Sequence, residues 1–277
     1  MLLPALCIGH RVELARPQAG CVHSCFEGAV NLLIEGNLWS LLDGARSDLP
    51  FGIRLATGTA PGRLELRVGQ PVQAKAGYLG VGPLTIDCRM AMRWWPRGWS
   101  APTAGLAARL DRVERIAAPR AWRDSAEMAV AVTEALLRRG PGAAAMLSGT
   151  VGRVVGRGPG LTPAGDDVLV GILTVLGSTA ARPMGASLRA RLVAALRPWL
   201  GTTGDISRQL LQQVMQGSPG RALHELGQAV VEGMDEAAMQ SALERLLDSG
   251  GSSGADGCIG LIAACRRLWL PAERAIA

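Results

Sequence analysis

The spacing of apolar residues changes near residue 119, and this change separates two kinds of predicted structure. Before it, apolar and polar residues alternate in residues 84–94 and again in residues 64–68. A period of two is typical of a strand with one buried face. Glu35-Gly36-Asn37 lies between two apolar runs, which is a hairpin signal. We therefore expect a small antiparallel sheet or barrel from the start to about residue 100.

Helical patterns follow. Residues 119–140 have acids early, arginines late and a glycine at the end, which fits the helix dipole and a C-terminal glycine cap. Further helical patterns begin near residues 206, 223 and 239, the last after Asp235 as its N-cap. The second half of the chain is therefore expected to be mostly α.

Together these patterns predict an α+β fold. An N-terminal antiparallel β sheet or small barrel, in a domain of residues 1–115, is followed by a mostly α-helical C-terminal domain of residues 116–277. Prolines and glycines break regular structure between residues 96 and 105. Three tryptophans lie beside this break, and we expect them to seal the domain junction, with a partner interface as the alternative: Trp94, Trp95 and Trp99.

Composition narrows the class of protein. The hydrophobic fraction of 48% is that of a globular protein, and no run is long and apolar enough for a membrane span or a signal peptide. We expect a cytoplasmic protein. The net charge is +6, but the arginines are dispersed and aromatics make up 4%, which argues against nucleic-acid binding. The six cysteines lack the spacing of a zinc site, so we expect them to serve as small buried hydrophobic residues.

The stretch GPGLTPAGDDVLVG, residues 158–171, is a glycine-rich loop that leads into a helix. Gly158 and Gly160 permit close backbone approaches. Thr162 suits an N-cap, and the residue after it, Pro163, suits the first helical position. Such a junction can bind an anion on free backbone amides. The glycine spacing is not that of a dinucleotide-binding loop, and the lysine of a Walker loop is missing.

Asp166 and Asp167 fall in the first turn of the predicted helix. Two carboxylates beside an anion repel it unless a cation intervenes, so Mg²⁺ is possible here, although the sequence requires no cofactor. Alternatively, one of them orients or deprotonates a substrate amide or water. A third interpretation is that both acids merely cap the helix.

A second stretch repeats this pattern. When residues 251–262 are aligned with residues 162–173, Gly254 falls on Gly165, Asp256 falls on Asp167, and the later glycines coincide. The acid and the later glycine are four apart and share a helix face. We expect the two helix starts to converge on one pocket, with a simple packing repeat of glycine-bearing helices as the alternative.

These patterns select the candidate site. A third helix start, residues 201–211, offers hydroxyl groups, and one arginine lies inside the glycine loop. His224 is expected at the surface. The catalytic candidates, which are also the ligands of any metal, are Asp167, Asp256 and Asp166. The candidates for binding a small anionic substrate are Gly158, Gly160, Thr162, Gly165, Arg157, Thr203, Ser207, Ser252, Ser253 and Gly254.

The glycine loop with its GLTPAGDD core, the helix start with Thr203 and Ser207, and the later SSGAD resemble a bacterial family long regarded as a domain of unknown function. Its named member is a subunit of oxamate carbamoyltransferase, encoded with allantoin-degradation genes. Ala164 and Gly251 depart from the family pattern, which more often has serine and a polar residue there.

The resemblance implies a transferase of purine catabolism that interconverts oxalurate plus phosphate with oxamate plus carbamoyl phosphate. It also implies partners in the form of other subunits. Carbamoyl transfer chiefly needs positioning and charge stabilisation, which fits the lack of a nucleophile elbow in the sequence. The alternative is a non-catalytic scaffold subunit of a multi-protein metabolic complex.

Overall fold

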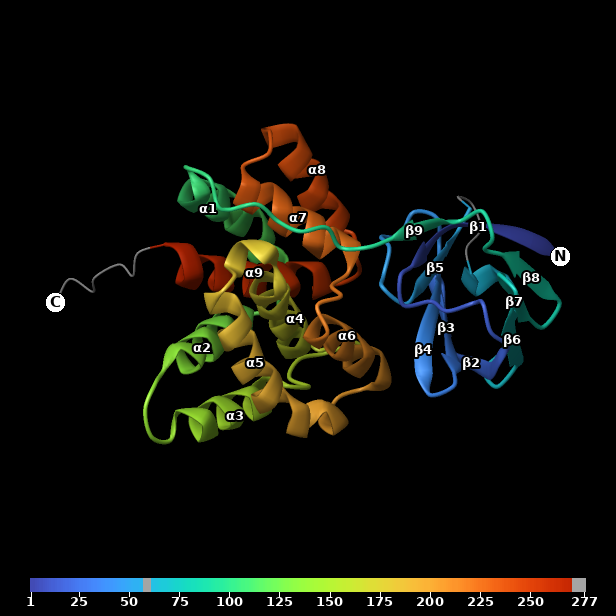
Figure 1. Cartoon of the computed structure of the whole chain (residues 1–277), viewed down its shortest axis with the longest axis horizontal. Coiled ribbons are helices and arrows are strands. Elements are labelled where there is room, and N and C mark those ends of the chain that lie inside the picture. The colour runs from blue at the N-terminus through green and yellow to red at the C-terminus, as the bar shows by residue number, and fades with distance from the viewer. Residues whose placement is uncertain (57–60, 271–277) are drawn as a thin grey trace. The chain divides into compact units, whose positions relative to one another are not determined.

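Figure 1 shows the computed structural model, which describes residues 1–56 and 61–270. The chain divides into two compact units, Met1–Pro96 and Arg97–Ala277. The first unit is built of strands and the second of helices, so the predicted α+β class is confirmed. The division lies earlier in the chain than the boundary expected at residue 115, because residues 106–117 form a helix.

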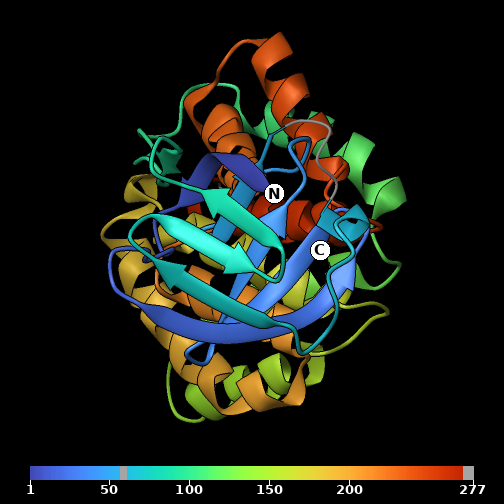
Figure 2. The same cartoon turned by 90° about the vertical axis from the view of Figure 1, so that its right-hand side faces the viewer.

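The first unit is a closed β-barrel (Figures 1 and 2). Its sheet runs in the order β5-β4-β3-β2-β6-β7-β8-β1-β9, and pairing of β1 with β5 closes it. Alternate side chains fill the interior, among them the fully buried Leu32, Ile53 and Leu79. The strands are β1 (Leu2–Gly9), β2 (Gln18–Phe26), β3 (Ala29–Ile34), β4 (Asn37–Leu42), β5 (Gly52–Leu55), β6 (Pro71–Lys75), β7 (Tyr78–Val81), β8 (Leu84–Asp87) and β9 (Met92–Trp94).

The predicted hairpin is confirmed, and two other strand predictions are wrong in part. Glu35 and Gly36 join β3 to β4 with φ of 47° and 79°, as a two-residue hairpin loop requires. Residues 84–94 do not form one strand, because Arg89 bonds back to Asp87 and turns the chain between β8 and β9. Residues 64–68 alternate in sequence but pair with no strand in the described part of the barrel.

The second unit is a bundle of helices (Figure 1). Its centre is formed by α4 and α9, which are buried along most of their length. The helices predicted near residues 206, 223 and 239 are confirmed, and Asp235 caps the last through the amide of Ala238 at 2.8 Å. The helices are α1 (Leu106–Ala117), α2 (Ser125–Leu137), α3 (Ala143–Val154), α4 (Ala164–Gly177), α5 (Met184–Leu196), α6 (Asp205–Met215), α7 (Arg221–Glu232), α8 (Glu236–Leu247) and α9 (Ser253–Trp269).

Glycines let α4 and α9 cross at backbone contact. A Cβ on Gly171 would lie 2.0 Å from the carbonyl oxygen of Gly257, and a Cβ on Gly260 would lie 2.1 Å from that of Val168. The sequence repeat aligns Gly171 with Gly260 and Val168 with Gly257. The two contacts are therefore reciprocal, and the repeat in sequence is a repeat in packing.

The earlier glycine of each repeat has a matching role. A Cβ on Gly165 would lie 2.0 Å from the carbonyl oxygen of Val154 at the end of α3. A Cβ on Gly254 would lie 2.0 Å from that of Leu246 at the end of α8. In each half, a glycine in the first turn of the inner helix lets the preceding helix approach closely. The halves α3–α4 and α8–α9 are thus built alike.

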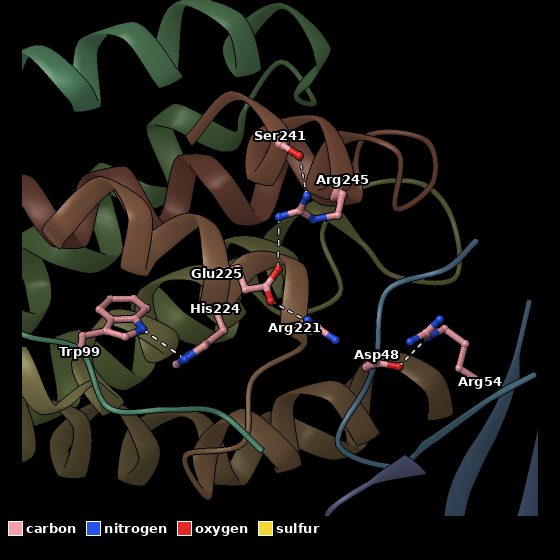
Figure 3. A network of polar contacts seen from close by, with 8 residues as sticks. All are labelled: Asp48, Arg54, Trp99, Arg221, His224, Glu225, Ser241 and Arg245. Atoms are coloured by element: carbon pink, nitrogen blue, oxygen red, sulfur yellow. Dashed lines mark hydrogen bonds and ion pairs between the residues drawn. The ribbon is translucent and has the colours of Figure 1, made fainter. Parts of the chain in front are cut away.

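His224 is buried, so its predicted place at the surface is wrong. The indole Nε1 of Trp99 donates to its Nε2 at 3.3 Å (Figure 3), and burial lowers the pKa of His224 to about 4. Trp99 thereby packs into the core of the helical unit. Trp94 and Trp95 instead belong to the β unit, where both rings contact the ring of His10.

Figure 3 shows further ion pairs, each within one unit. In the helical unit, Glu225 on α7 pairs with Arg221 on the same helix and with Arg245 on α8. In the barrel, the guanidinium of Arg54 meets the buried carboxylate of Asp48 at 2.7 Å. Each contact lies inside one unit and stabilises that unit.

We expect Gly171→Ala to destabilise the helical unit by about 3 kcal/mol, because the new methyl group meets a backbone oxygen that cannot move aside. The higher helix propensity of alanine offsets about 1 kcal/mol of a larger loss. Thermal unfolding measures the change. Gly201→Ala is the control, since open space surrounds that position. Equal melting temperatures for the two variants would contradict the close crossing.

Candidate functional site

The N-termini of α2, α4 and α9 come together in the helical unit. The hydroxyl groups of Thr162 and Ser253, which precede α4 and open α9, lie 2.5 Å apart. Asp256 in the first turn of α9 accepts a hydrogen bond from Ser125 at the start of α2. The residues at the three N-cap positions make no side-chain cap bond: Asp124, Pro163 and Ser252. Backbone carbonyls instead accept from some of the first amides: those of Ser125, Gly165 and Asp166 donate to Trp122, Arg157 and Pro163.

The start of α4 differs from its prediction by one residue. Pro163 occupies the N-cap position and α4 begins at Ala164, so Thr162 is not the cap. Its hydroxyl group bonds instead to Ser253 across the junction. Asp166 and Asp167 do fall in the first turn, as predicted.

The loop before α4 depends on its glycines. Gly156, Gly158 and Gly160 have φ of 72°, 115° and 91°, a region that disfavours other residues. A Cβ on Gly158 would also lie 2.8 Å from the amide nitrogen of Ala164. The loop folds back on the helix start, where the amide of Gly165 donates to the carbonyl of Arg157 at 2.9 Å.

Asp166 is a fully bonded buried carboxylate. It accepts from the amide of Gly156 at 2.9 Å, and from the hydroxyl groups of Thr203 and Ser207 at 2.5 and 2.6 Å. These donors come from the glycine loop and from the start of α6. Thr203 and Ser207 therefore hold Asp166, and the three residues fasten the loop to α6.

Asp256 is completely buried, and its two oxygens differ sharply. Oδ1 accepts from the amide of Trp122 at 2.7 Å and from the hydroxyl of Ser125 at 2.6 Å. Oδ2 is buried and meets no hydrogen-bond donor. A buried polar atom without a partner is costly, so this oxygen calls for an explanation.

Asp167, the equivalent residue in the other repeat, has the same feature. Its side chain is buried and its Oδ2 meets no donor. Burial raises the pKa of Asp167 well above its usual value, and the nearby charges of Asp256 and Asp166 raise it further. Hydrogen bonds from Ser253 and Thr162 act in the opposite direction but do not prevail. Asp167 is therefore the acid of this cluster that burial drives toward its protonated form.

The two motifs thus each bury a carboxyl group with one oxygen that no protein donor meets, and Asp256 is near enough to Asp167 for its charge to raise the pKa of Asp167. A proton, a cation or the donor of a ligand would satisfy them. In the part of the chain that the structure describes, no three His, Cys, Asp or Glu side chains are grouped so as to hold a metal ion. The oxygens of Asp166 accept from three protein donors. The carboxyl groups left for any ligand are therefore those of Asp167 and Asp256.

Arg157 lies at the rim of this cluster. Its guanidinium is 2.9 Å from Asp124 Oδ2 and 5.8 Å from the centre of the Trp122 ring. Its side chain is 49% exposed, so it can reach a ligand from solvent. Arg123, also near the Trp122 ring, is more exposed still.

The remaining sequence candidates lie on the same helix starts. Gly160 and Gly158 belong to the loop, and Ser252 and Ser253 open α9. Gly165 and Gly254 are buried where α3 and α8 pack. Sequence reasoning missed three residues of the site: Trp122, Asp124 as the partner of Arg157, and Ser125. They open α2, and nothing in their spacing connects them to Asp256.

Each unit of the chain matches the profile of a known protein family. Residues 154–265 match a profile described as oxamate carbamoyltransferase subunit AllH, and residues 5–93 match one described as the AllH family N-terminal domain. The chain belongs to the AllH family. The first match contains both acids of the pair, and the second covers nearly all of the barrel. The AllH family is by its description a carbamoyltransferase subunit.

Two further comparisons, with curated proteins and with solved structures, identify no relative of this chain. In residues 1–56 and 61–270, no helix has the length and hydropathy needed to cross a membrane.

We expect Asp166→Ala to lower the free energy of unfolding by about 3 kcal/mol, because two buried hydroxyl groups and the amide of Gly156 lose their acceptor. Asp167→Asn should cost little at neutral pH, since the amide keeps the shape of the carboxyl group. Urea unfolding measures both changes. A larger loss for Asp167→Asn than for Asp166→Ala would contradict the assignment of Asp166 to structure.

The stability of the unmodified chain should depend on Asp167. Its pKa is raised in the folded state, so the folded chain holds a proton that the unfolded chain releases above about pH 4. Stability contributed by this group is complete at low pH and declines as pH rises toward the folded-state pKa. Asp167→Asn should flatten this decline in urea unfolding followed from pH 4 upward. Parallel pH profiles for the two proteins would contradict the raised pKa.

Proposed function

We propose that this chain binds the small anionic substrates of an oxamate carbamoyltransferase at the joined starts of α2, α4 and α9. One observation carries the proposal. Asp167 and Asp256, equivalent residues of two repeats, each keep a buried oxygen without a donor beneath helix starts that lack side-chain caps. Asp166, the third buried carboxylate in these first turns, accepts three hydrogen bonds from the protein. Two buried acids that each keep an oxygen without a donor are better explained by ligand binding than by helix capping.

The rim of the site suits an anion. The positive ends of three helix dipoles lie there. Arg157 adds a charged, planar donor that suits a carboxylate or a phosphate. Asp124 holds this guanidinium, so a substrate anion would take the place of the Asp124 carboxylate.

The acids suit the transfer step. When oxamate attacks carbamoyl phosphate, its amide nitrogen bonds to the carbamoyl carbon, the bond from that carbon to the phosphate oxygen breaks, and the nitrogen gives up a proton. A carboxylate beside the nitrogen can take that proton. Asp256 fits this role because two donors hold its Oδ1 in place and leave Oδ2 without a protein partner. Asp167 would stabilise the carbonyl oxygen as charge develops on it.

A second candidate function is a non-catalytic scaffold. Trp95 in the β unit is 59% exposed, and Met90 and Met92 beside it are also exposed. Large apolar side chains at the surface are often contacted by partner subunits. On this view Trp95→Ala would remove the partners, and the acids would tolerate substitution. Trp99 is no longer a docking candidate, because it is buried in the helical unit.

We expect Arg157→Ala to weaken the binding of carbamoyl phosphate or oxamate by at least about tenfold, the cost of losing one charged hydrogen bond. The melting temperature should barely change, because a half-exposed ion pair contributes little to stability. Isothermal titration of the full chain measures binding. Arg139→Ala, at an exposed arginine between α2 and α3, is the control.

Turnover of the assembled enzyme completes the test. Asp256→Asn should reduce the rate by at least about a hundredfold if the carboxylate takes the proton. Full binding by Arg157→Ala together with full turnover by Asp256→Asn would favour the scaffold. Loss of both activities while the partner subunits remain bound would exclude it.

A further inference from the structure

We propose that one face of the helical unit, formed by the turn after α2, by α3 and by α5 with the segment that follows it, binds an acidic surface of a partner subunit. We call it the arginine face, and its charged members are Arg138, Arg153, Arg191 and Arg197. The matched family is by its description a subunit, so the occupant is another subunit of the same enzyme. This inference goes beyond the proposed function and needs neither the buried acids nor the anion site.

The charges along this part of the chain are one-sided. Between residues 138 and 204 the only acids are Asp166 and Asp167, and both are buried. The nearest acids on either side, Glu134 and Asp205, are each paired with an arginine outside the stretch. The same stretch contains eight arginines: Arg138, Arg139, Arg153, Arg157, Arg182, Arg189, Arg191 and Arg197.

A hydrogen bond joins α5 to the turn after α2. The guanidinium of Arg191 donates to the carbonyl oxygen of Arg138 at 2.7 Å. Figure 1 shows α3 and α5 as neighbours within the helical unit. Two arginines that are 53 positions apart in the sequence are therefore brought together at one edge of these helices.

The segment after α5 lies against α3. The indole Nε1 of Trp199 donates to the carbonyl oxygen of Ser148 at 3.1 Å, and a Cβ on Gly152 would lie 2.6 Å from the same indole ring. Arg197 is two residues before this tryptophan, and Arg153 follows Gly152 directly. The contact therefore adds two more arginines to the same face.

These arginines are accessible and make no ion pair within the described residues. Arg138, Arg153 and Arg197 are exposed, Arg191 is half-buried, and no acid that the structure describes pairs with any of the four. Elsewhere in the helical unit, arginines on α1 and α9 do pair with acids of neighbouring helices: Arg112, Arg266 and Arg267. Like charges gathered without counter-charges repel each other, and an acidic partner would remove this cost.

The chemistry of the face favours a protein over a nucleic acid. Met146 on α3 is 47% exposed, and arginine and methionine are both enriched in protein–protein interfaces. The aromatic residue of this stretch, Trp199, packs its ring against Gly152, so it offers no platform on which a base could stack. The planar guanidinium groups match the carboxylates of Asp and Glu side chains.

The first test measures, by sedimentation, the affinity of this chain for its partner subunits in the assembled enzyme. Arg138→Glu combined with Arg197→Glu should weaken the assembly at least about a hundredfold, because two carboxylates would then meet an acidic surface. Changing both residues to Gln should weaken it less. Added salt should weaken the unmodified assembly. The control, Arg115→Glu combined with Arg120→Glu, reverses two exposed arginines on and after α1 and should leave the assembly intact. Melting temperatures should stay the same in all these variants.

A second test separates the classes of acidic partner. The isolated full chain is titrated at low ionic strength with poly-L-glutamate, with a single-stranded oligothymidylate and with phosphatidylglycerol vesicles. The chain should bind poly-L-glutamate, and the Arg138→Glu, Arg197→Glu variant should lose this binding. Tighter binding of the oligonucleotide or the vesicles through the same arginines would overturn the assignment to a protein partner. Self-association of the chain that this variant abolishes would assign the face to a second copy instead.

The two proposals fail separately. A variant with both arginines reversed that still assembles at full affinity would overturn the arginine face. This variant should bind oxamate as the unmodified chain does, because none of its changes lies at the helix starts. An unmodified chain that assembles through these arginines but binds no oxamate would overturn the proposed function alone.

Discussion

The backbone crossing of α4 and α9 is the constraint on which the helical unit depends. Gly171 and Gly260 each lie against a carbonyl oxygen of the opposite helix, at distances that leave no room for a side chain. Because the helices touch there, their first turns are carried to the same place, and Thr162 meets Ser253. Other helices complete the bundle around this crossing, and the acids are buried as a consequence.

Two neighbouring acids in the first turn of α4 have different roles. Asp166 and Asp167 are neighbours in the first turn of α4, yet Asp166 gives its oxygens to three protein donors and Asp167 keeps one oxygen without a donor. The first arrangement stabilises the fold. The second costs stability, because an unsatisfied buried carboxyl group is unfavourable. Such a cost is typical of positions retained for binding or catalysis.

Much of this arrangement could be predicted from the sequence, because it depends on local signals. The period of two and the Glu35-Gly36 turn predicted the β-rich half, and the aligned Gly-x-Asp-x-x-x-Gly stretches predicted paired helix starts. Contacts between segments that are distant in sequence could not be predicted from these local signals. The alternation of residues 84–94 does not reveal the turn at Arg89, and the helical spacing of His224 does not reveal that Trp99 covers it. The start of α2 belongs to the site because the amide of Trp122 donates to Asp256, which lies 134 positions later in the sequence.

A crystal structure of the chain with bound oxamate would show whether the joined starts of α2, α4 and α9 bind substrate. Oxamate density is expected at the start of α4, with its carboxylate on Arg157 and its amide beside Oδ2 of Asp256. Density in another part of the chain, with Oδ2 of Asp256 still without a donor, would contradict this assignment.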